Sequence, residues 1–283
     1  MTAAGSVLIT GCSSGIGQAA ALALHEAGRT VVATARNPDT LSGLADRGLA
    51  TLALDVTDED SMRAAIDAAG PVGVLVNNAG YGLYGTVEQL PMAEIRRQFE
   101  TNFFGLVRLT QLVLPGMRAA GGGRILNVSS MGGRATLPGG AFYHASKYAV
   151  EALSDALRME VAQFGIDVVL IEPGPVRTPW NDVAAGSVAA SAAGSNGNGN
   201  GADPYTGFKD AVTAAFSTAT DGPLARFSSS ADDIAKVITR AVTVRRPRTR
   251  YLINPVARTT VTLRRWLPDR AYDAVLRRQY HLP

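Results

Sequence analysis

The chain has 283 residues, of which 46% are hydrophobic and 18% charged, so it can fold as one large α/β domain or two small ones. This balance excludes a disordered protein, and no uncharged apolar run approaches the ~18–20 residues that a membrane-spanning helix needs. Cys12 is the single cysteine, which excludes an intrachain disulfide and suits a reducing compartment. The first residues lack the basic region of a signal peptide, so we expect a cytoplasmic protein.

The net charge of +3 is unevenly distributed. Residues 245–283 hold ten of the 27 basic residues and two of the 24 acidic ones, so this segment carries +8 and the rest of the chain −5. The segment lacks a recognition motif for nucleic acid, so we expect no nucleic-acid partner. A solvated basic face and a weak attraction to an acidic membrane surface both remain open.

The chain begins with a strand, a glycine loop and a helix. Residues 6–10 (SVLIT) form an apolar run, residues 11–17 (GCSSGIG) a glycine-rich loop, and residues 18–27 a helical pattern. Glycines let the backbone approach a ligand closely, and N–H groups at a helix N-terminus can hold a phosphate. A tight turn without a ligand is the alternative interpretation.

The next strand, residues 30–35, ends at Arg36. An acidic residue at this place binds the ribose 2′-hydroxyl of NAD, whereas an arginine accepts the 2′-phosphate of NADP. Asp39 comes after Asn37-Pro38 and is better placed to begin a turn or helix. Arg36 therefore predicts a preference for NADP(H), with NAD(H) possible, and Ser13 could add a hydroxyl; a solvated arginine is the alternative.

Further strands are predicted as apolar runs at residues 50–54, 73–76, 124–128 and 166–171, with helical patterns between them. Polar residues or glycines follow these strands, namely Asp55, Asn77-Asn78-Ala79-Gly80, Ser129-Ser130 and Pro173-Gly174. Continuous apolar strands are typical of a parallel sheet covered on both faces, whose carboxyl ends line one crevice. We therefore predict an α/β fold, a single doubly wound domain over residues 1–283 with about seven mainly parallel strands.

Two later segments depart from the alternation of strands and helices. Residues 181–208 are rich in Ala, Gly, Ser and Asn, which predicts a loop acting as a flexible substrate lid. A helix at 232–245 and a strand at 250–253 follow, and residues 255–283 predict a basic helical extension interrupted by Pro268.

Tyr143 and Lys147 lie four residues apart in a predicted helix over residues 143–164, and so share one face of it. An ammonium near a phenol lowers the phenol pKa from about 10, so the pair can exchange a proton with an alcohol or ketone oxygen. An ordinary amphipathic helix is the alternative. His144 points from another helix face, so we expect no catalytic role for it.

Taken together, these motifs resemble the short-chain dehydrogenase/reductase family. The matching residues cover about residues 5–180 and are Thr10-Gly11-x-x-x-Gly15-x-Gly17, Asn77-Asn78-Ala79-Gly80, Asn102, Ser130, Tyr143-x-x-x-Lys147, and Pro173-Gly174 with Thr178. The segment from residue 247 to residue 270 more loosely resembles members related to steroid and retinol dehydrogenases.

The resemblance implies a Rossmann-type fold and hydride transfer between a nicotinamide cofactor and a carbonyl or secondary alcohol. It implies that Tyr143 is the general acid/base, that Lys147 lowers its pKa and holds the nicotinamide ribose, that Ser130 bonds the substrate oxygen, and that Asn102 anchors a water. It implies homodimers or homotetramers through the two long helices. The cofactor would be bound by Gly11, Ser13, Ser14, Gly15, Ile16, Gly17, Arg36, Asp55, Val56, Asn78, Ala79, Gly80, Tyr143, Lys147, Pro173, Gly174, Val176 and Thr178.

The segments expected to face the substrate are mostly apolar and lack a basic clamp, which predicts a lipophilic alcohol or ketone. Its contacts would be Leu83, Tyr84, Met131, Leu137, Phe142 and Trp180, although packing of the lid is an alternative role for them. No metal site is predicted. A non-catalytic NADP(H)-binding sensor or scaffold is the alternative function, and the intact Ser130–Tyr143–Lys147 set argues against it.

Overall fold

A computed structural model describes residues 5–193, 203–221 and 225–282. Within these residues, one seven-stranded sheet has the order β3-β2-β1-β4-β5-β6-β9, and every neighbouring pair is parallel. Its strands are β1 (Ser6–Ile9), β2 (Val31–Ala35), β3 (Ala50–Ala53), β4 (Val72–Asn77), β5 (Gly123–Val128), β6 (Ile166–Pro173) and β9 (Arg250–Ile253). The predicted doubly wound α/β fold is confirmed.

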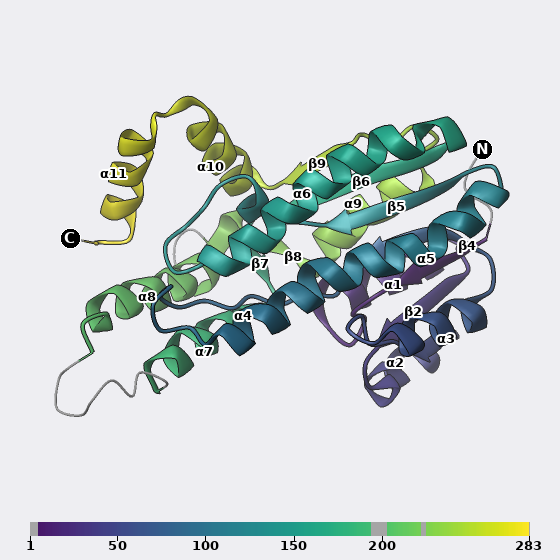
Figure 1. Cartoon of the computed structure of the whole chain (residues 1–283), viewed down its shortest axis with the longest axis horizontal. Helices are drawn as coiled ribbons and strands as arrows, with labels where there is room; N and C mark the ends of the chain where they lie inside the picture. Colours follow the sequence, from purple (N-terminus) through teal and green to yellow (C-terminus); the bar gives the residue numbers. More distant parts are fainter. Residues whose placement is uncertain (1–4, 194–202, 222–224, 283) are drawn as a thin grey trace.

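Helices cover both faces of the sheet, and Figure 1 shows α5 and α6 in front of the strands with α9 behind them. Alternate residues of each strand point to opposite faces, so Val7 and Ile9 pack on one helix layer and Leu8 on the other. The first layer holds α1 (Gly15–Glu26) and α9 (Ala231–Thr243). The second layer holds α3 (Glu59–Ala69), α5 (Gly105–Ala119) and α6 (Ala141–Val161).

The helical run between β4 and β5 changes its winding part-way along. Helix α4 (Met92–Phe99) passes into a π-helical turn, η2 (Glu100–Phe104), which passes into α5. Asn102 lies in that turn and is buried. Such turns are frequent at functional sites because they redirect the side chains that they carry.

The loop predicted over residues 181–208 is wrong for its first part, because α7 (Trp180–Ala193) is helical. Ala184, Val188 and Ser191 are buried at helical spacing. Alanine is the strongest helix former, and Gly186 and Ser187 between these positions concealed the pattern. Helix α8 (Thr206–Asp221) follows, and residues 194–202 lie outside the described residues.

The C-terminal residues form α10 (Pro255–Trp266) and α11 (Asp269–Gln279), which Leu267 and Pro268 separate. In Figure 1, α11 lies at the same end of the molecule as α7 and α8. The shorter elements are η1 (Pro38–Leu41), α2 (Ser42–Ala45), η3 (Met131–Gly133), η4 (Ala162–Phe164), β7 (Val176–Arg177), η5 (Ala225–Phe227) and β8 (Ser229–Ser230).

Gly105 allows α5 to pack closely against the end of β3. A Cβ atom there would lie 2.9 Å from the Val56 Cβ. We expect Gly105→Ala to lower the free energy of unfolding by about 1–3 kcal/mol, since overpacking forces the backbone to move. Gly116→Ala is the matched control in the same helix, because a Cβ there meets nothing within 4 Å and helix propensity favours alanine. Urea unfolding measures the free energy of unfolding of both variants. An equal change in the two variants would contradict the close packing of Gly105 on Val56.

Candidate active site

The carboxyl ends of the parallel strands open into a cavity of about 670 Å³. Residues that follow β1 to β6 line it, where a doubly wound sheet binds its ligands. Every residue predicted to bind the cofactor lines this cavity except Gly17, and every predicted catalytic residue lines it except Asn102.

Gly17 packs against the backbone of the glycine loop and does not line the cavity. It is buried, and a Cβ on it would lie against the Gly11 carbonyl and the Asn78 side chain. The Asn78 Nδ2 donates to the carbonyl oxygens of Thr10 (2.9 Å) and Gly11 (3.1 Å), which ties the loop to the residues after β4. Gly17 is therefore required for close packing of this loop, and its contact with a cofactor stays a prediction.

Arg36 lies at the opposite end of the cavity from the catalytic pair. It follows β2 directly, is exposed, and lines the cavity together with Asp55. Asp39 does not line the cavity, and its backbone N–H donates to Asn37 Oδ1 at 3.0 Å at the start of η1. The basic side chain, and not the acidic one, is therefore available to a group bound at this end.

Ser130, Tyr143 and Lys147 meet where β5 ends. Ser130 caps η3, with its Oγ accepting from Gly132 N–H at 3.0 Å, and its side chain is hydrogen-bonded to the Tyr143 phenol. Lys147 is buried one turn along α6, where its Nζ donates to the Val128 carbonyl at 2.8 Å. The Nζ lies 6.0 Å from the centroid of the Tyr143 ring.

Burial has the largest effect on the pKa values of Tyr143 and Lys147. It raises the pKa of Tyr143 to about 12, although the Ser130 hydrogen bond acts in the opposite direction. It also lowers the pKa of Lys147 to about 8, against the attraction of Glu151. The predicted lowering of the Tyr143 pKa is therefore wrong for this structure, because desolvation of the phenolate is the largest effect on it.

The sequence of the chain matches a family model described as short chain dehydrogenase over residues 5–186. The chain belongs to the short-chain dehydrogenase/reductase family. It is 36% identical to the uncharacterized oxidoreductase YbbO of Escherichia coli over 96% of this chain and 93% of that one. It is also 36% identical to bovine retinol dehydrogenase 8 over 88% and 81% of the two chains, which agrees with the loose resemblance to retinol dehydrogenases.

The fold of the chain is also similar to that of a solved structure. A short-chain dehydrogenase from Streptomyces avermitilis superposes with a TM-score of 0.75 at 32% identity, over 96% of this chain and 93% of that one.

Asn102 does not line the cavity, and its side chain is hydrogen-bonded to neighbouring residues of the chain. Its Oδ1 accepts from Tyr81 N–H at 3.0 Å, and its Nδ2 donates to the Tyr81 carbonyl at 2.9 Å and to Ser146 Oγ at 3.2 Å. These contacts join the π-helical turn to α6 and to the segment after β4. The side chain of Asn102 thus fixes the turn to its neighbours, and the water that Asn102 was predicted to anchor stays a prediction.

His144 is buried between two glycines of the segment that follows Ser130. Its Nδ1 lies 3.0 Å from the Gly132 carbonyl, and a Cβ on Gly140 would lie 2.6 Å from its Nε2. Burial lowers its pKa to about 4, so the ring is neutral at pH 7 with the proton on Nδ1. Its backbone partner shows that it shapes the segment between Ser130 and Tyr143, which explains why glycines are needed there.

The predicted substrate contacts divide into two groups. Tyr84, Met131, Leu137 and Trp180 line the cavity. Leu83 and Phe142 do not, and instead pack with Leu90 and Ile95, so the geometry does not support their predicted contact with a substrate. Each directly precedes a cavity tyrosine, and neighbouring residues point in different directions.

Sequence reasoning missed the part of the wall that lies beyond β6. These residues come from α7, α8 and the end of the chain and are Val183, Val212, Ala215, Phe216 and Tyr280. Apolar residues at helical spacing over 212–216 were the available signal for α8. No local pattern marks Tyr280.

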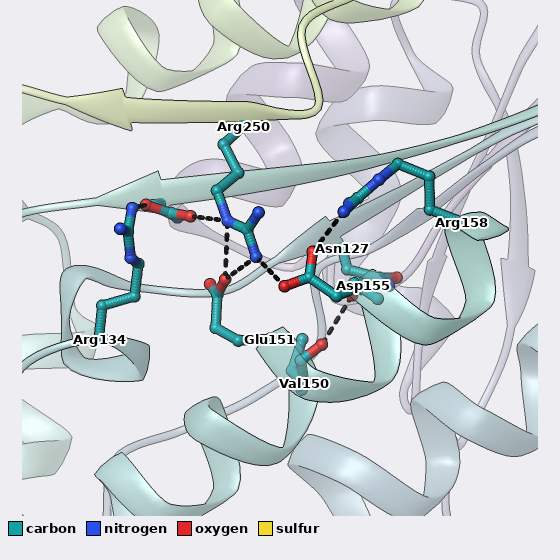
Figure 2. A network of polar contacts seen from close by, with 9 residues as sticks. Asn127, Arg134, Val150, Glu151, Asp155, Arg158 and Arg250 are labelled. Carbon is teal, nitrogen blue, oxygen red and sulfur yellow. Dashed lines mark hydrogen bonds and ion pairs between the residues drawn. The ribbon is translucent and has the colours of Figure 1, made fainter.

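A partly buried network of charges connects the middle of α6 to the edge of the sheet (Figure 2). Arg250 on β9 contacts Asp155 Oδ2 at 2.6 Å, Glu151 Oε2 at 3.2 Å and Glu172 Oε1 at 3.0 Å. Glu172 is fully buried and also pairs with Arg134 at 3.3 Å. Burial and the Glu172 carboxylate raise the pKa of Glu151 to about 7. Arg250 therefore compensates acidic groups on two elements that carry cavity residues.

Arg250→Met is expected to lower the free energy of unfolding by about 3 kcal/mol, because it leaves the buried Glu151 carboxylate without its guanidinium partner and Glu172 with Arg134 alone. Arg246→Met, at an exposed position just before β9, is the control and should change this free energy by less than about 0.5 kcal/mol. Denaturant titration measures the free energy of unfolding of the two variants and of the wild-type chain. A loss no larger for Arg250→Met than for the control would show that the network does not stabilise the fold.

Proposed function

We propose that this chain is an NADP(H)-dependent oxidoreductase that transfers a hydride between the cofactor and a carbonyl or secondary alcohol of a lipophilic substrate, with Tyr143 as general acid/base. The observation that carries this proposal is the meeting of Ser130, Tyr143 and Lys147 at one wall of the cavity. A non-catalytic NADP(H)-binding protein would need the glycine loop and Arg36 but not this hydrogen-bonded set.

The residues of the cavity fit a dinucleotide. Gly11 and Gly15 adopt φ angles of 72° and 58°, which only glycine adopts readily, and the N-terminus of α1 begins at this loop. Arg36 supplies a positive charge where the 2′-phosphate of NADP would be held. When bound, the nicotinamide supplies or accepts the hydride.

The side chains of the catalytic set manage the proton and the charge on the substrate oxygen. A Tyr143 pKa near 12 keeps the phenol protonated at pH 7, which is the form that donates a proton to a ketone oxygen during reduction. Ser130 places a second hydroxyl beside the phenol, where it can stabilise the developing alkoxide. Lys147 adds a positive charge at the same wall when protonated, which favours transient phenolate.

The substrate end of the cavity is apolar and aromatic. Tyr84, Trp180 and Phe216 line it with Leu137 and Val212. Apart from Lys147, the charged lining residues are Arg36, Asp55 and Arg97, which come from α4 or follow β2 and β3. A ketone or secondary alcohol on an apolar body suits such a surface, because burial of apolar area supplies affinity without a charged partner.

We also propose a homodimer or homotetramer that buries exposed apolar residues of the long helices, among them Phe104 and Met159. Weak attraction to acidic membranes is proposed for the C-terminal region, where Trp266 is 75% exposed beside Arg265. Within the described residues, no helix is long and apolar enough to span a bilayer. A cytoplasmic location remains a proposal.

Tyr143→Phe removes the proton donor and keeps the ring. We expect the rate of NADPH oxidation with a ketone panel to fall by about 10²–10⁴-fold. The dissociation constant for NADPH, measured by fluorescence, should stay within about threefold because the glycine loop is unchanged. A variant that retains turnover would contradict the assignment of Tyr143.

Arg36→Ala tests the cofactor preference. Loss of one charged contact to the 2′-phosphate should weaken NADPH binding by about 10–100-fold, since hydrogen bonds to charged groups contribute roughly 1.5–3 kcal/mol. Binding of NADH, which lacks that phosphate, serves as the internal control and should not change. Tighter binding of NADH than of NADPH by the wild-type chain would overturn the proposed preference.

A further inference from the structure

The substrate end of the cavity is enclosed by aromatic side chains from separate elements. Tyr84 follows β4, Tyr143 lies on α6, Trp180 begins α7, Phe216 lies on α8, and Tyr280 directly follows α11. The Tyr84 ring centroid lies 5.6 Å from that of Tyr143, 6.1 Å from that of Trp180 and 4.8 Å from that of Phe216. All five belong to one apolar cluster around the catalytic phenol.

Tyr280 comes from the far end of the chain, and its ring is held there by the structure of the C-terminal turn. Tyr280 N–H donates to the Leu276 carbonyl at 2.9 Å, and Leu282 N–H donates to the Arg277 carbonyl at 2.8 Å. His281 adopts a left-handed φ of 51°, which closes the turn. The ring is therefore presented by a defined helix end and does not hang from an extended tail.

Helix α11 is itself anchored on the catalytic region. Tyr272 is 3% exposed, and its hydroxyl donates to the Thr136 carbonyl at 3.2 Å. The Arg264 guanidinium lies 5.4 Å from the Tyr272 ring and pairs with Asp269 at 2.8 Å. The segment that carries Thr136 runs between Ser130 and Tyr143, so α11 packs directly on the residues that shape the site.

The properties of Tyr280 suit a residue that lines the cavity and packs there better than one that takes part in the reaction. Burial raises its pKa to about 12, so it carries no charge at neutral pH. Its ring packs in the cluster that holds Tyr84, Val212 and Phe216, and it lines the cavity beside them. Removing such a ring leaves an apolar void next to the cavity, and voids of this kind accept apolar ligands.

We propose that α11 forms the far wall of the substrate chamber and that Tyr280 is a specificity-determining residue, which limits the size of the ring-bearing ketone or alcohol that can lie against Tyr84 and Phe216. The inference rests on the proposed function, because it names the substrate class of the same site. Aromatic walls favour flat or cyclic apolar groups, whose edges and faces pack against the rings.

The test compares cyclohexanone with the two fused rings of 2-decalone in the presence of NADPH. Tyr280→Ala should raise the kcat/KM ratio of 2-decalone to cyclohexanone by at least about tenfold, because the void accommodates the second ring. Tyr280→Phe retains the ring and should keep the wild-type ratio. Arg278→Ala, at an exposed position on the same helix, is the matched control and should also keep it.

Calorimetric dissociation constants for both ketones, measured without NADPH, give the same comparison independently of turnover. An unchanged binding ratio in Tyr280→Ala, with NADPH affinity intact as the sign of a folded protein, would overturn the role of Tyr280. A shifted binding ratio in a chain that reduces neither ketone would support the wall and count against the proposed function. If Tyr280→Ala loses NADPH affinity, Tyr280→Leu replaces it under the same criteria.

Discussion

The architecture of the site depends on one requirement, which is that α6 buries Lys147 against the end of β5. The ammonium donates to the Val128 carbonyl at 2.8 Å, so the catalytic helix is fixed to the central part of the sheet at the point where Ser130 emerges. A buried ammonium is unfavourable without such a partner. The same helix buries Glu151 one turn later, and Arg250 from the last strand compensates it.

Most of the fold is predictable because it follows from local apolar patterns. The strands read as continuous runs, and the strand, loop and helix around Gly11 and Gly15 define the ligand edge of a parallel sheet. Helix α7 was missed because its buried positions, such as Ala184 and Val188, carry small side chains within a composition typical of loops. Its existence depends on packing against Tyr84, which local propensity does not report.

The sequence predicted that Ser130, Tyr143 and Lys147 lie together because several motifs follow the strands of one parallel sheet, and all three line one cavity. Gly17 and Phe142 do not line it, because being next to a cavity residue in sequence does not determine the side-chain direction. Tyr280 could not be predicted at all, since only the tertiary position of α11 brings it to the cavity.

The pKa of Tyr143 could not be predicted from its neighbour Lys147 alone. An adjacent ammonium favours phenolate, but burial acts on both groups and moves the pKa of Tyr143 up and that of Lys147 down. The phenol therefore stays protonated at neutral pH, which is the form that the proposed reduction of a carbonyl group requires.

The most direct test of the central claim follows a labelled hydride. NADPH with both C4 hydrogens of the nicotinamide replaced by deuterium is incubated with the wild-type chain and 2-decalone, and the product is analysed by mass spectrometry and NMR. The account predicts one deuterium on the carbinol carbon of the resulting alcohol. Oxidation of the cofactor without deuterium at that carbon would contradict it.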